Sequence, residues 1–297
     1  IEPEKILTSA YLRQWLVDAK ERLSAGSVET YGIIIERRII PAIGNIPLQK
    51  LRPAHVQAGH FSRYVLRVLK AALKSAVDLE LVSRNVAVAI KPPVRSTAEV
   101  EILSPAQISD VLKALHGTML FPIVSLALAS GMRRGELLAL RWQDISGTMV
   151  TVERSLEETV GAVRFKTPKT RAGRRTISIP ESTVMMLAEH RRQQLEMRMR
   201  LGLGKPQPDA LVFSNHEGEP IRADYVTAMW KRAVGGVKFH ALRHTHASAL
   251  IAAGIDVVTV SKRLGHASPA LTLSVYSHLF SNTDAAAAAA VANLLAK

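Results

Sequence analysis

Two adjacent prolines divide this chain. Pro92 and Pro93 lie in the segment Ile-Lys-Pro-Pro-Val-Arg-Ser. A proline donates no backbone hydrogen bond and clashes with a preceding helical turn, so the segment is not helical. Lys91 and Arg95 make it an extended basic strap. Because 297 residues are enough for two cores, we predict a domain over 1–91, a basic linker over 92–101 and a second domain over 102–284.

The first domain is predicted to be helical. Ser27 can cap a helix that runs to Pro41, and another helix is expected from near Pro53. Apolar residues recur at helical spacing over 61–81, the clearest helix of this half. Its other faces carry the basic side chains of Arg63, Arg67, Lys70 and Lys74.

The second domain is predicted to be mixed. Ser104 and Pro105 form a strong helix start, and helices are expected to about residue 140. From 149 to 179 apolar and polar residues alternate, which favours strands, and helices follow to the end. The predicted fold is mainly α with a small three-stranded antiparallel β-sheet made of Met149–Glu153, Ala162–Phe165 and Arg175–Ile179.

The net charge points to a polyanionic partner. Lys and Arg number 39 against 25 Asp and Glu, which gives a net charge of +14 and an isoelectric point near 10.3. An excess with this many arginines favours phosphate over a lipid surface. The alternative is a solvated basic surface with no dedicated partner.

Several classes of protein are excluded by what the sequence lacks. It has no cysteine, so it forms neither disulfides nor a cysteine zinc site. No apolar run approaches the ~20 residues that span a bilayer, so no membrane partner is expected. The N-terminus has no charged-then-apolar export signal, and Ile1 in place of an initiator Met reads as the start of a fragment.

Arg133 and Glu136 lie where an apolar helical segment begins. The positive end of a helix dipole adds to the charge of Arg133, which suits a bound anion. Glu136 is one helical turn on and can hold the guanidinium in place. The alternative is a surface Arg–Glu pair without a ligand.

Lys169 lies in a turn between two expected strands. A lysine at a hairpin tip can reach into a groove of DNA and protonate a leaving oxygen. Lys166 is expected to end the preceding strand and to face the backbone. The same region carries further basic side chains, and so it can instead be a solvated loop or a phosphate clamp: Arg171, Arg174 and Arg175.

A helix is expected to follow His240. On a helical wheel His240, Arg243 and His244 share one face, while His246 lies on the opposite face and is predicted to pack in the core. Three histidines can suggest a metal. Because the wheel separates His246 and no carboxylate completes a set, no metal site is predicted.

Two further side chains complete a reactive set. His266 follows a glycine that closes a helix, so it is predicted to be held at a turn. Tyr276 is expected about two turns into the next helix, where a tyrosine alone would only indicate core. With His240 and Arg243 it suits attack on a phosphodiester: arginine neutralises phosphorane charge, histidine moves protons and tyrosine forms a phosphoester.

In order and spacing these residues resemble the tyrosine recombinase (phage integrase) family. The first half is similar to the family's core-binding domain in Ile40-Pro-Ala-Ile-Gly44 and in Asn85 before the linker. The resemblance covers nearly the entire chain and implies a two-domain architecture, a helical core-binding domain plus a mixed catalytic domain. It is carried by Arg133 in Ser-Gly-Met-Arg, Lys169 in the hairpin, His240-x-x-Arg243, Leu-Gly-His266 and Tyr276.

The resemblance implies a role for each residue. Tyr276 would attack the scissile phosphate, leaving a 3′-phosphotyrosyl link and a free 5′-hydroxyl. Arg133 and Arg243 would stabilise the pentacoordinate phosphorus, with Glu136 supporting Arg133. The remaining roles would fall to His240 as acceptor of the tyrosine proton, Lys169 as donor to the 5′-oxygen and His266 as hydrogen-bond donor to the phosphate. No cofactor is implied, because the bond energy is stored in the protein–DNA ester.

The resemblance also implies partners. These are double-stranded DNA attachment sites, a homotetramer on that DNA, and an accessory DNA-bending protein or excisionase. Residues 285–297 look like the C-terminal helix that members dock on a neighbouring subunit, with packing on the same subunit as the alternative. The expected DNA contacts are Arg63, Arg67, Lys70, Lys91, Arg95, Arg171, Arg174 and Arg175.

Within the family we favour an integrase of a phage or integrative element, with chromosome dimer resolution as the alternative. A type IB topoisomerase has a similar site but works without a tetramer, and a DNA-binding regulator with a vestigial site is a rival of another class. The expected location is the cytoplasm, at the bacterial nucleoid. Many members carry an N-terminal arm-binding domain, which these residues do not contain.

Overall fold

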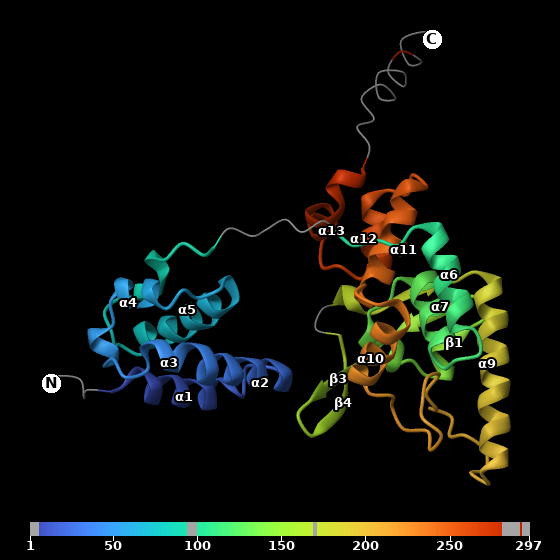
Figure 1. The fold of residues 1–297 in the computed structure, drawn as a ribbon, viewed down its shortest axis with the longest axis horizontal. Helices are drawn as coiled ribbons and strands as arrows, with labels where there is room; N and C mark the ends of the chain where they lie inside the picture. The colour runs from blue at the N-terminus through green and yellow to red at the C-terminus, as the bar shows by residue number, and fades with distance from the viewer. Residues whose placement is uncertain (1–5, 94–99, 169–170, 281–291, 293–297) are drawn as a thin grey trace. The chain divides into compact units, whose positions relative to one another are not determined.

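The computed structural model describes residues 6–93, 100–168, 171–280 and 292. Contacts divide the chain into two compact units, one of residues 1–98 with 159–162 and one of the remaining residues (Figure 1). Each unit has its own apolar core. The prediction of a mainly helical, two-domain fold with a small antiparallel β part is confirmed. No helix in the described ranges is long and apolar enough to cross a membrane.

The first unit is a helical cluster. Its helices are α1 (Thr8–Ala19), α2 (Ala25–Ile34), α3 (Ile40–Ile43), α4 (Pro53–Ala58) and α5 (Arg63–Asp78), with a π-helical turn η1 at Ile35–Ile39. The side chains of Leu12, Ile35, Ile39 and Leu69 are completely buried at its centre. Tyr11 donates from its hydroxyl to the Ala72 carbonyl at 2.7 Å, which joins α1 to α5.

The expected boundaries of the second helix are wrong at both ends. Ser24, not Ser27, occupies the N-cap position, and the helical path does not end at Pro41. It continues through the wide π turn into α3, with Pro41 in the first turn of α3. A proline removes a helical donor, and a π turn directly before it accommodates the missing bond.

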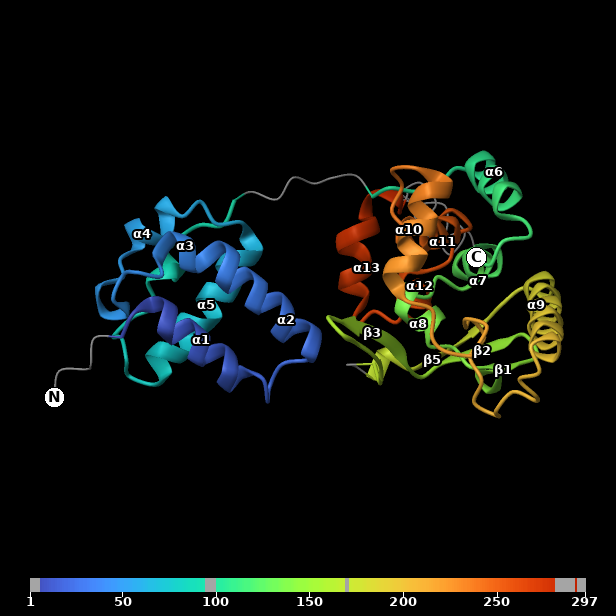
Figure 2. The same cartoon turned by 60° about the horizontal axis from the view of Figure 1, so that its bottom comes forward.

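The second unit combines helices with short strands. The helices are α6 (Pro105–Leu115), α7 (Leu120–Ser130), α8 (Arg134–Leu138), α9 (Glu181–Arg200), α10 (Ala223–Val234), α11 (Ala241–Ala252), α12 (Val257–Leu264) and α13 (Pro269–Tyr276). The predicted start of α6 is confirmed: the Ser104 hydroxyl accepts from the Gln107 amide at 3.2 Å, and Pro105 follows the cap. Helices α11, α12 and α13 lie side by side (Figure 1, Figure 2).

The strands form two sheets rather than the single sheet expected. One sheet has the order β1 (Ile145–Ser146), β2 (Met149–Val152), β5 (Arg175–Ser178), with Val150 opposite Ile177 in antiparallel register. Strand β4 (Ala162–Lys166) pairs instead with β3 (Ser155–Thr159). The side chains of β4 stay exposed or half-buried, so it has no apolar face to place on the core beside β2.

A third apolar cluster underlies the last helices. It contains Ala247 and Ile251 of α11, Val260 and Leu264 of α12, and Tyr276 at the end of α13. Tyr276 is only 1% exposed. The packing of these three short helices therefore sets the position of the phenol.

Candidate active site

Arg133 stands between two helices. Helix α7 ends at Gly131, whose left-handed φ of 66° turns the chain, and Arg133 occupies the N-cap position of α8. Glu136 in the first turn of α8 accepts from Arg133 twice, from the backbone amide and from Nη1, each at 2.8 Å. Arg133 Nη2 also donates to the Gly265 carbonyl at 3.2 Å. The local sequence thus fixes the guanidinium through a carboxylate one turn away.

Glu136 holds a second arginine. Arg175 Nη2 donates to Glu136 Oε2 at 2.9 Å, and Arg175 Nε donates to the Arg263 carbonyl at 2.7 Å. The side chains of Glu136 and Arg175 are 4% and 6% exposed. Burial alone would raise the pKa of Glu136, but the bonds from Arg175 and Arg133 outweigh it and lower that pKa. The Arg175 guanidinium, which was expected to contact DNA, faces inward and is bound to the Glu136 carboxylate.

Arg243 is a buried cation on α11. Its Nη1 donates to the Gly131 carbonyl at 2.8 Å and its Nη2 to the Leu264 carbonyl at 2.7 Å. Burial, and then the nearby charge of Arg133, lower the pKa of Arg243 to about 9. In the described part of the chain no carboxylate forms an ion pair with it. A buried charge without a counterion favours the binding of an anion.

The C-terminus of α12 orients both arginines. Arg243 donates to Leu264 and Arg133 donates to Gly265, two consecutive carbonyls at a helix end that carries partial negative charge. Gly265 has a φ of 68°, and a Cβ there would lie 2.8 Å from Arg175 Nη1. Glycine is therefore needed where the two guanidinium groups converge.

Tyr276 is hydrogen-bonded to a histidine that was not assigned a role from the sequence. The Tyr276 hydroxyl lies 2.6 Å from His244 Nδ1. His240, the expected proton acceptor, instead stacks edge-on against His244 with ring centroids 4.7 Å apart. A helical wheel places His240 and His244 on one face but does not show which ring reaches α13. Burial raises the pKa of Tyr276 to about 12, against the opposing effect of Arg243.

His266 is fixed at the turn after α12, as its sequence position predicts. Its Nδ1 lies 2.8 Å from the Thr272 hydroxyl oxygen. Burial, followed by the charges of Arg243 and Arg133, lowers the pKa of His266 to about 4. Burial likewise lowers the pKa of His240 to about 4. Both rings are therefore neutral at pH 7 beside the two arginines.

His246 is a core residue, as the wheel predicts. It is 7% exposed, its Nδ1 donates to the Leu128 carbonyl at 2.7 Å, and its Nε2 accepts from Arg263 Nε at 3.0 Å. Within the described residues no group of three or more potential ligand side chains is arranged to hold a metal ion.

The turn after β4 is described only in part. Lys169 lies outside the described residues, and nothing is described of the Arg171 side chain. Arg174 is exposed. Lys166 ends β4 but forms an ion pair with Glu157 of β3, so the expectation that it faces the backbone is wrong.

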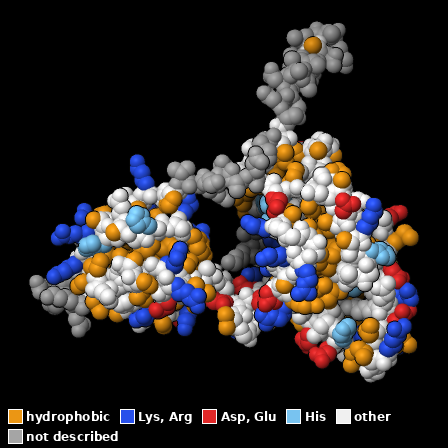
Figure 3. Space-filling view, in the orientation of Figure 1, with side chains coloured by type: hydrophobic (Ala, Val, Ile, Leu, Met, Phe, Trp, Pro, Cys, Tyr) orange, Lys and Arg blue, Asp and Glu red, His pale blue; other side chains and the backbone are white. Residues whose placement is uncertain are grey.

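Basic side chains of the first unit lie on and beside α5. Arg63 Nη2 donates to the Pro93 carbonyl at 3.0 Å, and Lys70 Nζ donates to the Ile90 carbonyl at 3.1 Å. Arg67 lies over the Tyr64 ring, 4.3 Å from its centroid. Lys91 is exposed, and Arg95 lies outside the described residues. Lys and Arg side chains are visible at several places on this unit in Figure 3.

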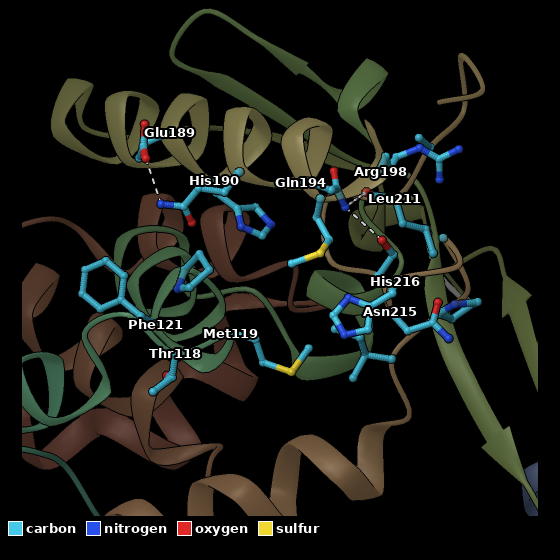
Figure 4. Close-up of a pocket in the computed structure, with 18 of the residues that line it drawn as sticks. Thr118, Met119, Phe121, Glu189, His190, Gln194, Arg198, Leu211, Asn215 and His216 are labelled. Carbon is cyan, nitrogen blue, oxygen red and sulfur yellow. Dashed lines mark hydrogen bonds between the residues drawn. The ribbon is translucent and has the colours of Figure 1, made fainter. Parts of the chain in front are cut away.

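A large cavity of about 860 Å³ lies elsewhere in the second unit. It is bordered by α7, α9 and the segment 206–225, and Figure 4 shows Met119, Phe121, His190 and Gln194 around it. None of the predicted catalytic residues lines it. The cluster around Tyr276 is thus separate from this cavity.

Comparisons with known proteins show the family of this chain. The phage integrase family matches residues 101–283, and the N-terminal SAM-like domain of phage integrases matches residues 9–60. A tyrosine recombinase XerC-like protein of Caldanaerobacter subterraneus is 31% identical over 278 residues, 84% of this chain and 70% of that protein. The chain belongs to the phage integrase family of tyrosine recombinases, enzymes that cleave DNA and exchange its strands.

Relatives from mobile elements are also similar. The ICEBs1 integrase of Bacillus subtilis is 27% identical, and the match covers 73% of this chain and 61% of that protein. The integrase of Mycobacterium phage L5 is 25% identical, and the match covers 97% of this chain and 80% of that protein.

Two solved structures share the fold. The Tn1549 transposon integrase in complex with transposon right end DNA has a TM-score of 0.76 at 18% identity, covering 95% of this chain and 98% of that one. A lambda integrase dimer bound to a COC′ core site has a TM-score of 0.65 at 17% identity, covering 93% and 96%.

Proposed function

We propose that this chain cuts and rejoins DNA at specific sites through a 3′-phosphotyrosyl intermediate formed on Tyr276, in the integration and excision of a mobile element. The observation that carries the proposal is the convergence of Arg133 and Arg243 on the consecutive carbonyls of Leu264 and Gly265. One of these guanidinium groups, Arg243, also acts electrostatically on Tyr276. A phenol beside fixed, buried positive charge suits attack on a phosphodiester.

The proposed reaction is a transesterification. The Tyr276 oxygen forms a bond to phosphorus as the bond to the 5′-oxygen breaks. Arg133 and Arg243 neutralise the non-bridging oxygens, and His266 donates a hydrogen bond to one of them. Lys169 supplies the proton that the 5′-oxygen gains. Rejoining is the reverse reaction with another strand's 5′-hydroxyl, so no outside energy source is required.

Glu136 has a supporting role in this scheme. It binds both Arg133 and Arg175 from a position that is 4% exposed. Preorganised charge stabilises a transition state without reorganising at the moment of reaction. We therefore assign Glu136 and Arg175 to the positioning of Arg133.

The proposed substrate is double-stranded DNA at attachment sites, and the proposed assembly is a homotetramer. Lambda integrase has been solved as a tetramer bound to a Holliday junction. The net charge of +14 supports a nucleic-acid partner. The similarity to the integrases of ICEBs1 and phage L5 supports a role in the integration and excision of a mobile element. We include an accessory DNA-bending protein or excisionase among the partners.

The proposal is tested by trapping the covalent intermediate. The protein is incubated with a pool of nicked duplexes of randomised sequence, and protein-linked DNA is isolated under denaturing conditions and sequenced. We expect a protease-sensitive adduct enriched in one sequence, and none with Tyr276→Phe, which should retain DNA binding in a gel shift. No adduct from the wild-type chain would indicate a DNA-binding regulator, and relaxation of any supercoiled plasmid by the monomer would indicate a topoisomerase.

A further inference from the structure

We propose that His244 is a catalytic residue of strand cleavage, where its imidazole accepts the phenolic proton of Tyr276 as the Tyr276 oxygen attacks phosphorus. This inference rests on the proposed function, because it assigns a residue to that reaction. It differs from the role expected for His240 from the sequence.

The Tyr276 hydroxyl and His244 Nδ1 are 2.6 Å apart, a short hydrogen bond between α13 and α11. The phenol is 1% exposed, and His244 is half-buried beside it. The two rings meet at 62° with centroids 5.7 Å apart, so the imidazole nitrogen points at the hydroxyl. A general base must lie within hydrogen-bond reach of the proton that it removes, and His244 does.

The neighbours of His244 keep it neutral. Burial, and then the charge of Arg243, lower the pKa of His244. A neutral imidazole with its proton on Nε2 offers Nδ1 as an acceptor. Tyr276 is protonated at neutral pH, since burial raises its pKa to about 12, and it can donate. Both partners are thus in the protonation states that a transfer from phenol to imidazole requires.

The transfer is balanced by the bond changes at phosphorus. As the oxygen–phosphorus bond forms, the oxygen–hydrogen bond breaks and His244 becomes an imidazolium. The negative charge moves to the phosphate oxygens, where Arg133 and Arg243 stabilise it. In rejoining, the imidazolium returns the proton to Tyr276 as the phosphotyrosyl bond breaks. His244 therefore ends each cycle neutral.

His240 has a different contact in the structure. Its ring packs perpendicular to that of His244 at 4.7 Å, and among the described residues the hydrogen bond of the Tyr276 hydroxyl is to His244. Burial, and then the charges of His244 and Arg243, lower the pKa of His240. A neutral His240 next to the two arginines is available to donate to a bound phosphate. His244 then accepts the proton of the nucleophile, and His240 donates a hydrogen bond to the phosphate.

Two substitutions distinguish a base from a positioning residue. Asparagine places its amide oxygen near the position of Nδ1, so His244→Asn retains an acceptor for Tyr276 but cannot take up a proton. His244→Ala loses both properties. Cleavage is measured in single turnovers on a nicked duplex of the sequence selected from the randomised pool. We expect both variants to form the adduct about 10²-fold to 10⁴-fold more slowly than wild type, with unchanged DNA binding.

Other outcomes would overturn the inference. Wild-type rates in His244→Asn with a slow His244→Ala would make His244 a positioning residue, and wild-type rates in both would remove it from the reaction. A wild-type chain that forms no adduct contradicts the proposed function instead. A second measurement needs no variant: nitrogen NMR of the histidine-labelled wild-type protein should show His244 as the Nε2–H tautomer. A proton fixed on Nδ1 would contradict its role as acceptor.

Discussion

The carboxylate of Glu136 and the guanidinium of Arg175 form a buried ion pair across 39 positions of sequence, with Oε2 and Nη2 separated by 2.9 Å. The same carboxylate holds Arg133, so one acidic side chain orients two arginines. A buried charge that loses its partner is strongly destabilising. Stability and activity should therefore depend together on Glu136.

Replacing Glu136 by Gln is expected to lower the free energy of unfolding by about 3 kcal/mol, because two buried or half-buried guanidinium groups lose their counterion. Adduct formation should slow as Arg133 loses its fixed orientation. Denaturant unfolding and the trapping assay measure these effects. The matched control is Glu189→Gln, which breaks an exposed pair with Arg192. It should leave the free energy of unfolding and the rate of adduct formation close to wild type. Wild-type behaviour of Glu136→Gln would exclude the positioning role.

Replacing Gly131 by Ala is expected to destabilise the second unit by about 2–3 kcal/mol. Gly131 has a φ of 66°, and an added Cβ would lie 2.5 Å from His246 Cδ2, on a ring held at both nitrogens. Gly147→Ala is the control, since Gly147 has a φ of 54° but nothing within 4 Å of the added Cβ. It should cost about 1 kcal/mol, the backbone penalty alone. Equal losses in the two variants would show that the contact with His246 is unimportant.

Acid should destabilise the protein through His246. Burial lowers the pKa of His246 to about 4 from its ordinary 6.5. Between these values the unfolded chain binds a proton that the folded chain does not, so stability is full above pH 6.5 and is lost as the pH falls towards 4. The loss from this residue is on the order of 3 kcal/mol.

Proton uptake on unfolding at pH 5, from calorimetry in buffers of different ionisation enthalpy, tests this. His246→Asn retains a donor for the Leu128 carbonyl but has no titrating ring, so it should take up about one proton fewer than wild type. Identical uptake in the two proteins would mean that His246 is not the group that resists protonation.

Replacing Arg67 by Ala is expected to weaken DNA binding and to reduce the dependence of log affinity on log salt by about one unit. Arg67 is exposed over the Tyr64 ring, and among the described acidic side chains it has no ion-pair partner. Arg13→Ala is the control, because the Arg13 guanidinium pairs with Glu36 at 2.8 Å. Gel shifts over a salt series measure both. An Arg67→Ala slope equal to that of wild type would remove Arg67 from the DNA contacts.

Sequence periodicity predicted individual helices and strands. It did not predict which residues far apart in the sequence contact one another. Ser104 with Pro105 predicted the start of α6 because capping depends on neighbouring residues. The single sheet was wrong, since alternation identifies strands but not which strand each one meets. The inward position of Arg175 was also missed, because an arginine in a basic stretch shows no sign of a carboxylate 39 residues away.

The sequence alone determined the family and predicted the reactive set. The set can be recognised from residue types at definite spacings, which are visible without a structure. Its members are Arg133, His240, Arg243, His266 and Tyr276. Only the tertiary structure decided that Tyr276 meets His244 and that Leu264 and Gly265 orient the two arginines. The physical reason is that these contacts are set by how α11, α12 and α13 pack. A helical wheel gives the face of a side chain but not the neighbour that it touches.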